Sequence, residues 1–165
     1  GGSFVAHHRT RCCLLTGGRM RKQYLNPKEI FQSPFFTHTV AVSGPARIIY
    51  VSRQVSYDRD GFVIGKDDMR AQAEQVFKCL THNLKAAGAT WSDVVKLNGY
   101  MVRMNADAVN LYREVRSRYL DAKRMPASTL IGVKRLVHDD LLLEVEVIAA
   151  VAETDAPKKA KKKKR

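Results

Sequence analysis

The chain has 165 residues, and its net charge of +13 at first suggests a nucleic-acid-binding protein. The charge lies at the ends. Residues 1–22 hold five basic residues and residues 158–165 hold seven, with no acidic residue in either segment, which leaves 17 basic against 16 acidic residues in 23–157. This balance argues against a basic nucleic-acid-binding domain. No apolar run reaches the ~18 residues of a membrane helix, and three cysteines, two of them adjacent, do not form a disulfide framework.

The composition divides the chain into three parts: an extraneous or disordered segment over 1–22, one domain over 23–155, and a disordered basic tail over 156–165. Residues 1–19 show neither strand nor helix periodicity, and Met20 would serve as a start codon. A misplaced gene start or a cloning remnant therefore fits this segment better than an Arg-rich transit peptide. We expect a cytoplasmic protein. The tail Lys158–Arg165 is expected either to bind polyanions weakly and non-specifically or only to add solubility.

The predicted elements follow the order strands, helix, strand, helix, two strands. Strands are predicted over 37–43, 48–55, 94–102, 128–133 and 141–151. Helices are predicted from a cap at Asp67 to about Ala87, and from a cap at Asn105 or Asp107 to about Leu120. This order indicates an α+β fold with helices on one sheet face, and the strand–helix–strand units require some parallel pairing. The other sheet face also carries apolar residues, so we expect oligomerisation to cover it.

The last predicted strand carries two acidic residues on one face. Glu144 and Glu146 alternate with apolar residues, so both carboxylates point to the same side. A carboxylate in so apolar a strand is costly unless it finds water, a donor or a cation. The pattern therefore predicts a site, or an interface that encloses one. The alternative is a pair of surface or salt-bridged acids.

Several stretches taken together resemble the YjgF/Rid family over about Tyr24–Val151. They are Ser52-Arg53-Gln54, Ala89-Thr90-Trp91-Ser92-Asp93-Val94-Val95-Lys96, Met104-Asn105 with Val109-Asn110, Pro126-Ala127, Arg135-Leu136 and Glu144-Val145-Glu146-Val147-Ile148-Ala149. The resemblance implies a homotrimer with a mixed six-stranded sheet, two helices on one sheet face, and clefts between subunits. The best-known members hydrolyse reactive enamines and imines. Neither a metal nor an organic cofactor is expected, and the histidines show no metal-ligand spacing.

Glu144 is, by this resemblance, the residue that directs the hydrolytic water. The residue after Pro-Ala is the main departure, because an Arg there grips the substrate carboxylate in deaminase members and this chain has Ser128. Losing ~3 kcal/mol of charge-assisted hydrogen bonding would weaken binding of a 2-imino acid roughly 100-fold. Arg53 replaces the Gly of Ser-Gly-Gln. It either restores a cation from another strand, or fills the pocket or reaches solvent.

Three further residues are expected to bind the ligand. Phe35 stands where many members have Tyr, which keeps the ring and removes the hydroxyl. Leu130 stands where deaminases often have Cys, but its backbone N–H and C=O still serve as ligand contacts. Asn110 is retained, although an Asn in the first turns of a helix often bonds locally.

The resemblance implies binding of a small metabolite in inter-subunit clefts, and its enzymatic hypothesis is imine or enamine hydrolysis with an altered substrate. One alternative is a non-catalytic trimeric ligand-binding or regulatory protein that kept the cleft. Another is an RNA-acting L-PSP-type ribonuclease or translation inhibitor, which the near-neutral domain does not support.

Overall fold

A computed structural model describes residues 18–153 of the chain. It contains six strands, β1 (Arg21–Leu25), β2 (Thr39–Ser43), β3 (Ala46–Gln54), β4 (Val94–Val102), β5 (Ala127–Val133) and β6 (Leu143–Ala152). The helices are α1 (Met69–Ala86), α2 (Ala106–Ser117) and the short 3-10 helix η1 (Trp91–Asp93). This order confirms the predicted α+β class. The predictions for the leading segment up to residue 17 and for the basic tail lie outside the described residues.

The six strands form two sheets, which corrects the expectation of a single six-stranded sheet. The main sheet has the order β3-β6-β4-β5, with β4 and β5 parallel and the other pairs antiparallel, so it is mixed as predicted. Strands β1 and β2 pair antiparallel in a separate sheet. A single bridge between Thr37 and Ala127 links the segment before β2 to the edge strand β5.

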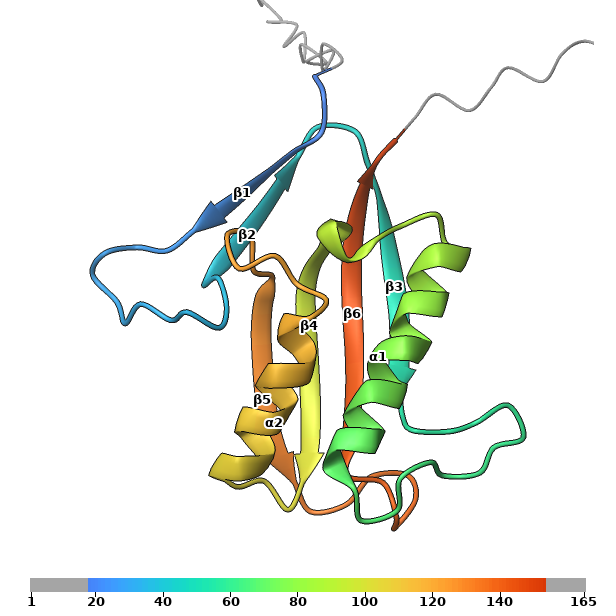
Figure 1. The fold of residues 1–165 in the computed structure, drawn as a ribbon. Helices are drawn as coiled ribbons and strands as arrows, with labels where there is room; N and C mark the ends of the chain where they lie inside the picture. The colour runs from blue at the N-terminus through green and yellow to red at the C-terminus, as the bar shows by residue number, and fades with distance from the viewer. Residues whose placement is uncertain (1–17, 154–165) are drawn as a thin grey trace, which may run out of the picture.

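The chain leaves the small sheet at Gly44-Pro45. Gly44 has a φ of +85°, which L side chains rarely adopt, and a Cβ there would lie 3.0 Å from the backbone oxygen of Arg19. This left-handed turn sends β2 and β3 in different directions, so the two strands diverge rather than pair (Figure 1). Strand β1 begins at Arg21, inside the segment that composition alone assigned to the region before the domain.

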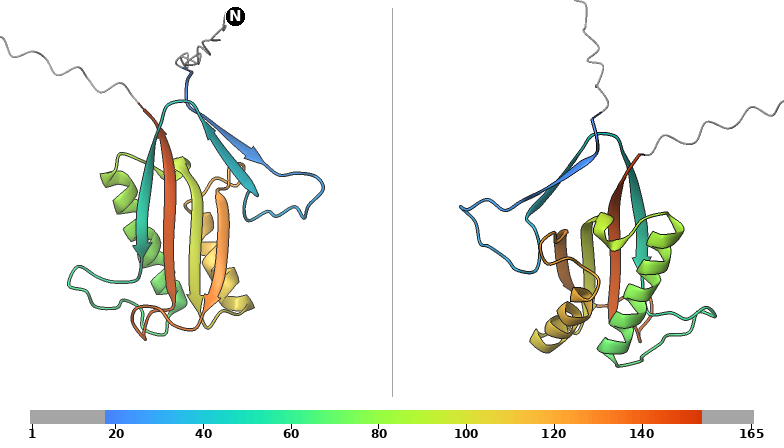
Figure 2. Two further views of the ribbon diagram at one scale, coloured as in Figure 1. Left: turned by 180° about the vertical axis from the view of Figure 1, so that it is seen from behind. Right: turned by 45° about the horizontal axis from the view of Figure 1, so that its top comes forward.

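Both helices cover one face of the main sheet (Figures 1 and 2). Alternation along β6 places Leu143, Val145, Val147 and Ala149 on this face, each at most 1% exposed. The apolar stripe of α1 packs against them, and its Phe77 is fully buried. Burying each such aliphatic or aromatic side chain stabilises the fold by about 1.5–3 kcal/mol. None of the helices within residues 18–153 has the length and apolar character needed to cross a membrane.

The helix starts are fixed by side-chain caps. Asn105 caps α2 by accepting a hydrogen bond from the backbone N–H of Ala108, which confirms the first of the two predicted caps. At α1 the cap is Asp68 instead of Asp67, because Asp68 is extended and accepts from the backbone N–H of Ala71. Asp67 has a φ of +57° and instead accepts a hydrogen bond from Arg103.

The face of the main sheet opposite the helices is called the open face below. It exposes large apolar side chains: Tyr50 is 77% exposed, Ile131 46% and Ile48 42%. No helix within residues 18–153 covers this face, which Figure 2 (left) shows in front of the helices. A patch of this kind on a sheet face is typical of a protein–protein interface.

Candidate functional site

Glu144 lies on the open face and is only 9% exposed. One of its carboxylate oxygens, Oε2, accepts a hydrogen bond from Arg53 Nη1 at 3.0 Å. Its other oxygen, Oε1, accepts no hydrogen bond from the residues described. Half of the Arg53 side chain is exposed, so this ion pair contributes little to stability and can exchange partners. The structure thus places a nearly buried carboxylate with one free oxygen beside an exchangeable cation.

A β-bulge aims Arg53 at Glu144. The register of β3 on β6 shifts between Val51 and Gln54, so two residues of β3 lie opposite one residue of β6. Strict alternation after the buried Val51 would place Ser52 on the open face and turn Arg53 toward the helices. The extra residue lets Arg53 point to the open face. Gln54 returns to the helix side, where it accepts a hydrogen bond from Asn83 of α1.

Glu146, the second acid of β6, is held more firmly than Glu144. Its Oε1 accepts hydrogen bonds from Asn98 Nδ2 at 2.9 Å and from Tyr100 Oη at 3.2 Å. Burial, together with the charge of Glu146, raises the pKa of the Tyr100 hydroxyl, so this group remains a donor at neutral pH. Two donors therefore fix Glu146, which leaves Glu144 as the acid that can engage a ligand or water.

A depression of about 490 Å³ adjoins Arg53 at the β3 edge of the sheet. It is lined by the end of β3, by the following loop, by α1 and by the loop between β5 and β6; the lining residues include Ser52, Arg53, Tyr57, Asp58, Cys79 and Val137. Burial raises the pKa of the Cys79 thiol, so Cys79 is protonated at neutral pH and is a weak nucleophile. The chemistry of this depression therefore comes from Arg53 and the neighbouring Glu144.

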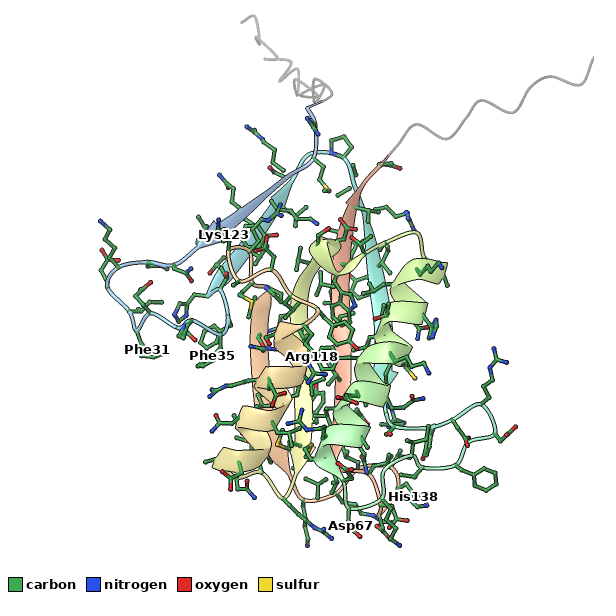
Figure 3. All side chains as sticks on the ribbon, viewed as in Figure 1. Phe31, Phe35, Asp67, Arg118, Lys123 and His138 are labelled. Carbon is green, nitrogen blue, oxygen red and sulfur yellow. The ribbon has the colours of Figure 1, made fainter. Side chains whose placement is uncertain are left out.

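The other predicted residues gather at the opposite edge of the sheet, between β5 and α2. Ser128 lies in register with the buried Leu97 on the helix side of the sheet. Its hydroxyl accepts a hydrogen bond from Arg116 Nη1 at 3.3 Å, and Arg116 Nη2 donates to the backbone oxygen of Phe35 at 2.5 Å. The Phe35 ring lies 4.0 Å below the guanidinium carbon of Arg113. Figure 3 labels Phe35 on the segment between β1 and β2.

Arg116 is a residue of this edge that the sequence analysis missed. It is only 4% exposed, it forms no ion pair within residues 18–153, and its Nε has no hydrogen-bond partner there. One feature of the sequence could have indicated its burial. Arg116 directly follows Val115 and lies one turn after Tyr112, and both of these residues are on the apolar side of α2. The sequence analysis considered Arg53 as a cation that could compensate for Ser128, but the cation that contacts Ser128 is Arg116 of α2.

The sequence profile of the endoribonuclease L-PSP family matches residues 33–151. The chain belongs to this family. A RutC family protein of Pyrococcus abyssi is 35% identical over 101 residues, covering 61% of this chain and 76% of that protein. AldR of Lactococcus lactis, named as a candidate regulator, is 30% identical over 105 residues, covering 63% and 79%. YyfB of Yersinia pestis, a Rid family protein of unknown function, superposes with a TM-score of 0.66 at 32% identity, covering 79% of this chain and 98% of YyfB. These matches confirm the YjgF/Rid resemblance.

Within one copy of this YjgF/Rid chain, the predicted residues do not form one site. Glu144 and Arg53 lie on the open face, whereas Ser128 lies on the helix side of β5, with β4 between β5 and β6. Two strand spacings amount to about 10 Å, and the sheet itself separates the two faces. The predicted catalytic acid and the predicted substrate-binding edge are therefore two separate surfaces of the chain.

The last two predicted residues of the family site differ in their surroundings. Leu130 points inward, since a Cβ added to Gly99 would lie 2.9 Å from Leu130 Cδ1 and 3.3 Å from Tyr112 Oη. Its side chain therefore packs in the fold, and only its backbone remains available to a ligand. Asn110 is exposed on α2, and its side chain makes no hydrogen bond within residues 18–153. Over the same residues, no group of three His, Cys, Asp or Glu side chains is arranged to hold a metal ion.

Proposed function

We propose that this YjgF/Rid family member assembles as a homotrimer and binds a small metabolite in clefts between subunits, where it hydrolyses an imine or enamine. The separation of the predicted residues onto two surfaces carries this proposal. A site that uses both surfaces takes Glu144 and Arg53 from one copy, and Phe35, Ser128 and Leu130 from the next. A closed ring of three copies repeats this pairing three times and leaves neither surface unpaired.

Two features of the open face support the assembly. Its exposed apolar side chains, including Tyr50 and Ile131, would leave water when copies associate. Asn98 lies among them, and its Oδ1 is buried without a hydrogen-bond partner in the described part of the chain. An unsatisfied buried acceptor costs about 1–3 kcal/mol. A donor from a neighbouring copy would remove that cost.

The proposed reaction needs a positioned water and a group that moves protons. The imine carbon is already electrophilic, so a water oxygen adds to it while Glu144 accepts a proton from that water. Glu144 passes this proton to the nitrogen, which gives a carbinolamine. The hydroxyl proton of the carbinolamine is then transferred to the nitrogen as the C–N bond breaks, so ammonia leaves and a carbonyl remains. The free oxygen Oε1 of Glu144 is the group available for this transfer, because Oε2 is bound to Arg53.

An ammonia-release assay on imines generated by an amino-acid oxidase tests the reaction. We expect turnover by the wild type and its loss in Glu144→Gln, which keeps the shape of the side chain but cannot accept the proton. Glu146→Gln is the matched control, since this acid lies two residues away on the same face and is held by two donors. Equal rates for wild type and Glu144→Gln would reject Glu144 as the catalytic group.

Mixing two inactive variants tests whether each site spans two copies. Glu144→Gln damages the acidic surface, and Ser128→Phe fills the opposite edge. If each site joins the two surfaces from different copies, refolding an equal mixture creates intact sites in about a quarter of the clefts. We expect activity near that fraction of the wild-type rate. A mixture as inactive as its components, with both variants shown to be trimeric, would mean that each site lies within one chain.

A second candidate function is ligand binding without turnover. The ion pair between Arg53 and Glu144 favours it, because the guanidinium occupies Oε2 and leaves only one carboxylate oxygen free to contact a water. The regulator name given to AldR of Lactococcus lactis is consistent with such a role. A small molecule that binds in the cleft and is recovered unchanged, with no ammonia released from any imine, would favour this candidate. RNA cleavage gains no support from the net charge of residues 23–157, where 17 basic residues stand against 16 acidic residues.

A further inference from the structure

The depression beside Arg53 has walls that the fold of one copy holds in place. The loop after β3 and the loop before β6 lie at the same end of the main sheet as the start of α1 (Figure 1). Asp58 fixes the first of these loops by accepting hydrogen bonds from two backbone N–H groups of its own turn. Gln75 of α1 holds the same loop by donating to the Tyr57 carbonyl at 2.7 Å. The depression is therefore formed before a ligand arrives.

The fold already uses two of the polar side chains in the lining. The amide of Gln54 donates to two backbone carbonyls of β3 and accepts a hydrogen bond from α1. The carboxylate of Asp58 is bound within its turn. The rest of the lining includes Tyr57, Cys79 and Val137, and Val137 is 56% exposed. The surface that the depression offers to a ligand is therefore mainly apolar.

Arg53 connects the depression to the proposed catalytic acid. Its side chain lines the depression, while its guanidinium donates to Glu144 Oε2. A ligand with its reacting carbon beside Glu144 Oε1 can extend along the methylene stem of Arg53 into the depression. The volume of about 490 Å³ lies in the range of small-molecule sites. A second depression of about 750 Å³ shares Tyr57, Asp58 and Cys79 with the first and continues along α1, so a long side chain also finds room.

We propose that this depression is the side-chain pocket of the active site and selects imines with a bulky apolar side chain, above all an aromatic one. The inference deepens the proposed function by naming the substrate class, and it rests on that function for the reaction. An aromatic ring buries a large apolar area, and contacts between sulfur and a ring are favourable. Cys79 on α1 and Val137 on the loop between β5 and β6 are then specificity-determining residues.

Ammonia release from two imines tests the pocket. An amino-acid oxidase generates the imines of phenylalanine and of 2-aminobutyrate, which share a carboxylate and differ only in the side chain. After subtraction of the uncatalysed rate, we expect the wild type to prefer the phenylalanine imine about tenfold in kcat/KM, because its ring is partly buried. In Cys79→Phe the new ring fills the depression, and we expect the preference to be lost. Lys85→Phe is the matched control, since Lys85 is exposed in the last turn of α1 and outside the lining. It should keep the preference.

Val137→Glu tests the same pocket at an exposed position, where the fold tolerates a change. A carboxylate in the depression would lose water to an incoming ring, so we expect the preference for the phenylalanine imine to fall here as well. Phe62→Glu is the control for this variant. Phe62 is 71% exposed on the loop after β3 and does not line the depression, so the preference should be unchanged.

Protection of Cys79 from alkylation provides a measurement that needs no turnover. Phenylpyruvate is the product expected from the phenylalanine imine, and its ring should cover the Cys79 thiol. We expect it to slow the reaction of Cys79 with iodoacetamide several-fold, followed by mass spectrometry of the peptide that contains this residue. The shorter product 2-oxobutyrate does not reach the thiol and should leave the rate near that of the free protein.

Equal kcat/KM for the two imines would overturn the pocket and leave the proposed hydrolysis standing. The same holds if Cys79→Phe and Val137→Glu both keep the wild-type preference. No protection of Cys79 by phenylpyruvate, or equal protection by 2-oxobutyrate, would also overturn the pocket. Protection by phenylpyruvate alone, in a protein that hydrolyses neither imine, would uphold the pocket and reject the hydrolysis.

Discussion

Replacing Tyr50 by Glu should dissociate the proposed trimer. Tyr50 is the most exposed of the large apolar side chains on the open face, at 77%. It lies opposite Ile148 of β6, about halfway along the edge strand β3, where a neighbouring copy would cover it. A carboxylate at this position would lose its hydration when copies associate, and the neighbouring side chains of the sheet would not supply a cation to pair with it. The side chain is exposed in a single copy, so we expect the substitution to act on the assembly and to leave the fold of one copy intact.

The size of the effect follows from the exposed area. A tyrosine buries about 200 Å² when it is fully covered, so covering the exposed part of Tyr50 removes about 150 Å² from water. At about 25 cal/mol per Å², this contributes about 4 kcal/mol per copy, or about 12 kcal/mol for three copies. Incomplete cover lowers this figure, and the desolvation of three carboxylates adds to the loss. Even half of it would weaken association by about four orders of magnitude.

Sedimentation velocity combined with light scattering measures the outcome. We expect the wild type at three times the chain mass of 18.6 kDa and Tyr50→Glu at that mass itself, with unchanged far-ultraviolet circular dichroism. Phe62→Glu is the matched control, because Phe62 is 71% exposed on the loop that leaves the β3 edge (Figure 1). We expect it to remain trimeric. A monomeric wild type, or a trimeric Tyr50→Glu, would refute the reasoning from the open face.

Three further outcomes follow from the structure. The Glu114 carboxyl should titrate by carbon NMR at about 2, because hydrogen bonds from Arg70 and Arg118 lower its pKa from 4.5; its stabilising effect is complete above pH 4.5 and lost as the pH falls toward 2, and Arg70→Met should move the midpoint upward. Gln72→Ala should lower the free energy of unfolding in urea by about 2–4 kcal/mol, since this buried amide bonds Gly65, Asp140 and Leu142. Deleting residues 158–165 should abolish retention on heparin, and retention that survives would place the basic surface in the domain.

Alternation and capping predicted most of the main sheet. Strand β4 has the predicted bounds, and Asn105 caps α2, because both depend on local patterns of apolar and polar residues. Strand β1 was missed since it is short, carries two basic residues in five, and lies next to a segment without periodicity. The division into two sheets depends on the turn at Gly44, and a Gly-Pro sequence shows that a turn occurs without giving its direction.

The sequence pattern did not predict where the side chains of Arg53 and Arg116 point. The bulge in β3 changes the side of the sheet to which Arg53 points, and a bulge of one residue leaves no periodic signal in so short a strand. Arg116 contradicts the general expectation that an arginine on a helix lies at the surface. The sequence predicted that Glu144 lies on the polar face of an otherwise apolar strand. The separation of Glu144 from Ser128 depends on the order of the strands in the sheet, which the sequence pattern does not give.

The two arginines differ in how firmly the fold holds them. Arg116 is buried and donates to the Ser128 hydroxyl and to the Phe35 carbonyl, so it joins α2 to β5 and to the segment before β2. Arg53 is half exposed, so moving it away from Glu144 costs little, and an incoming anion can compete for it. In the proposed cleft between copies, the negative charge of a ligand would draw Arg53 toward it and release Glu144 Oε2, so binding of an anionic ligand would itself free the base.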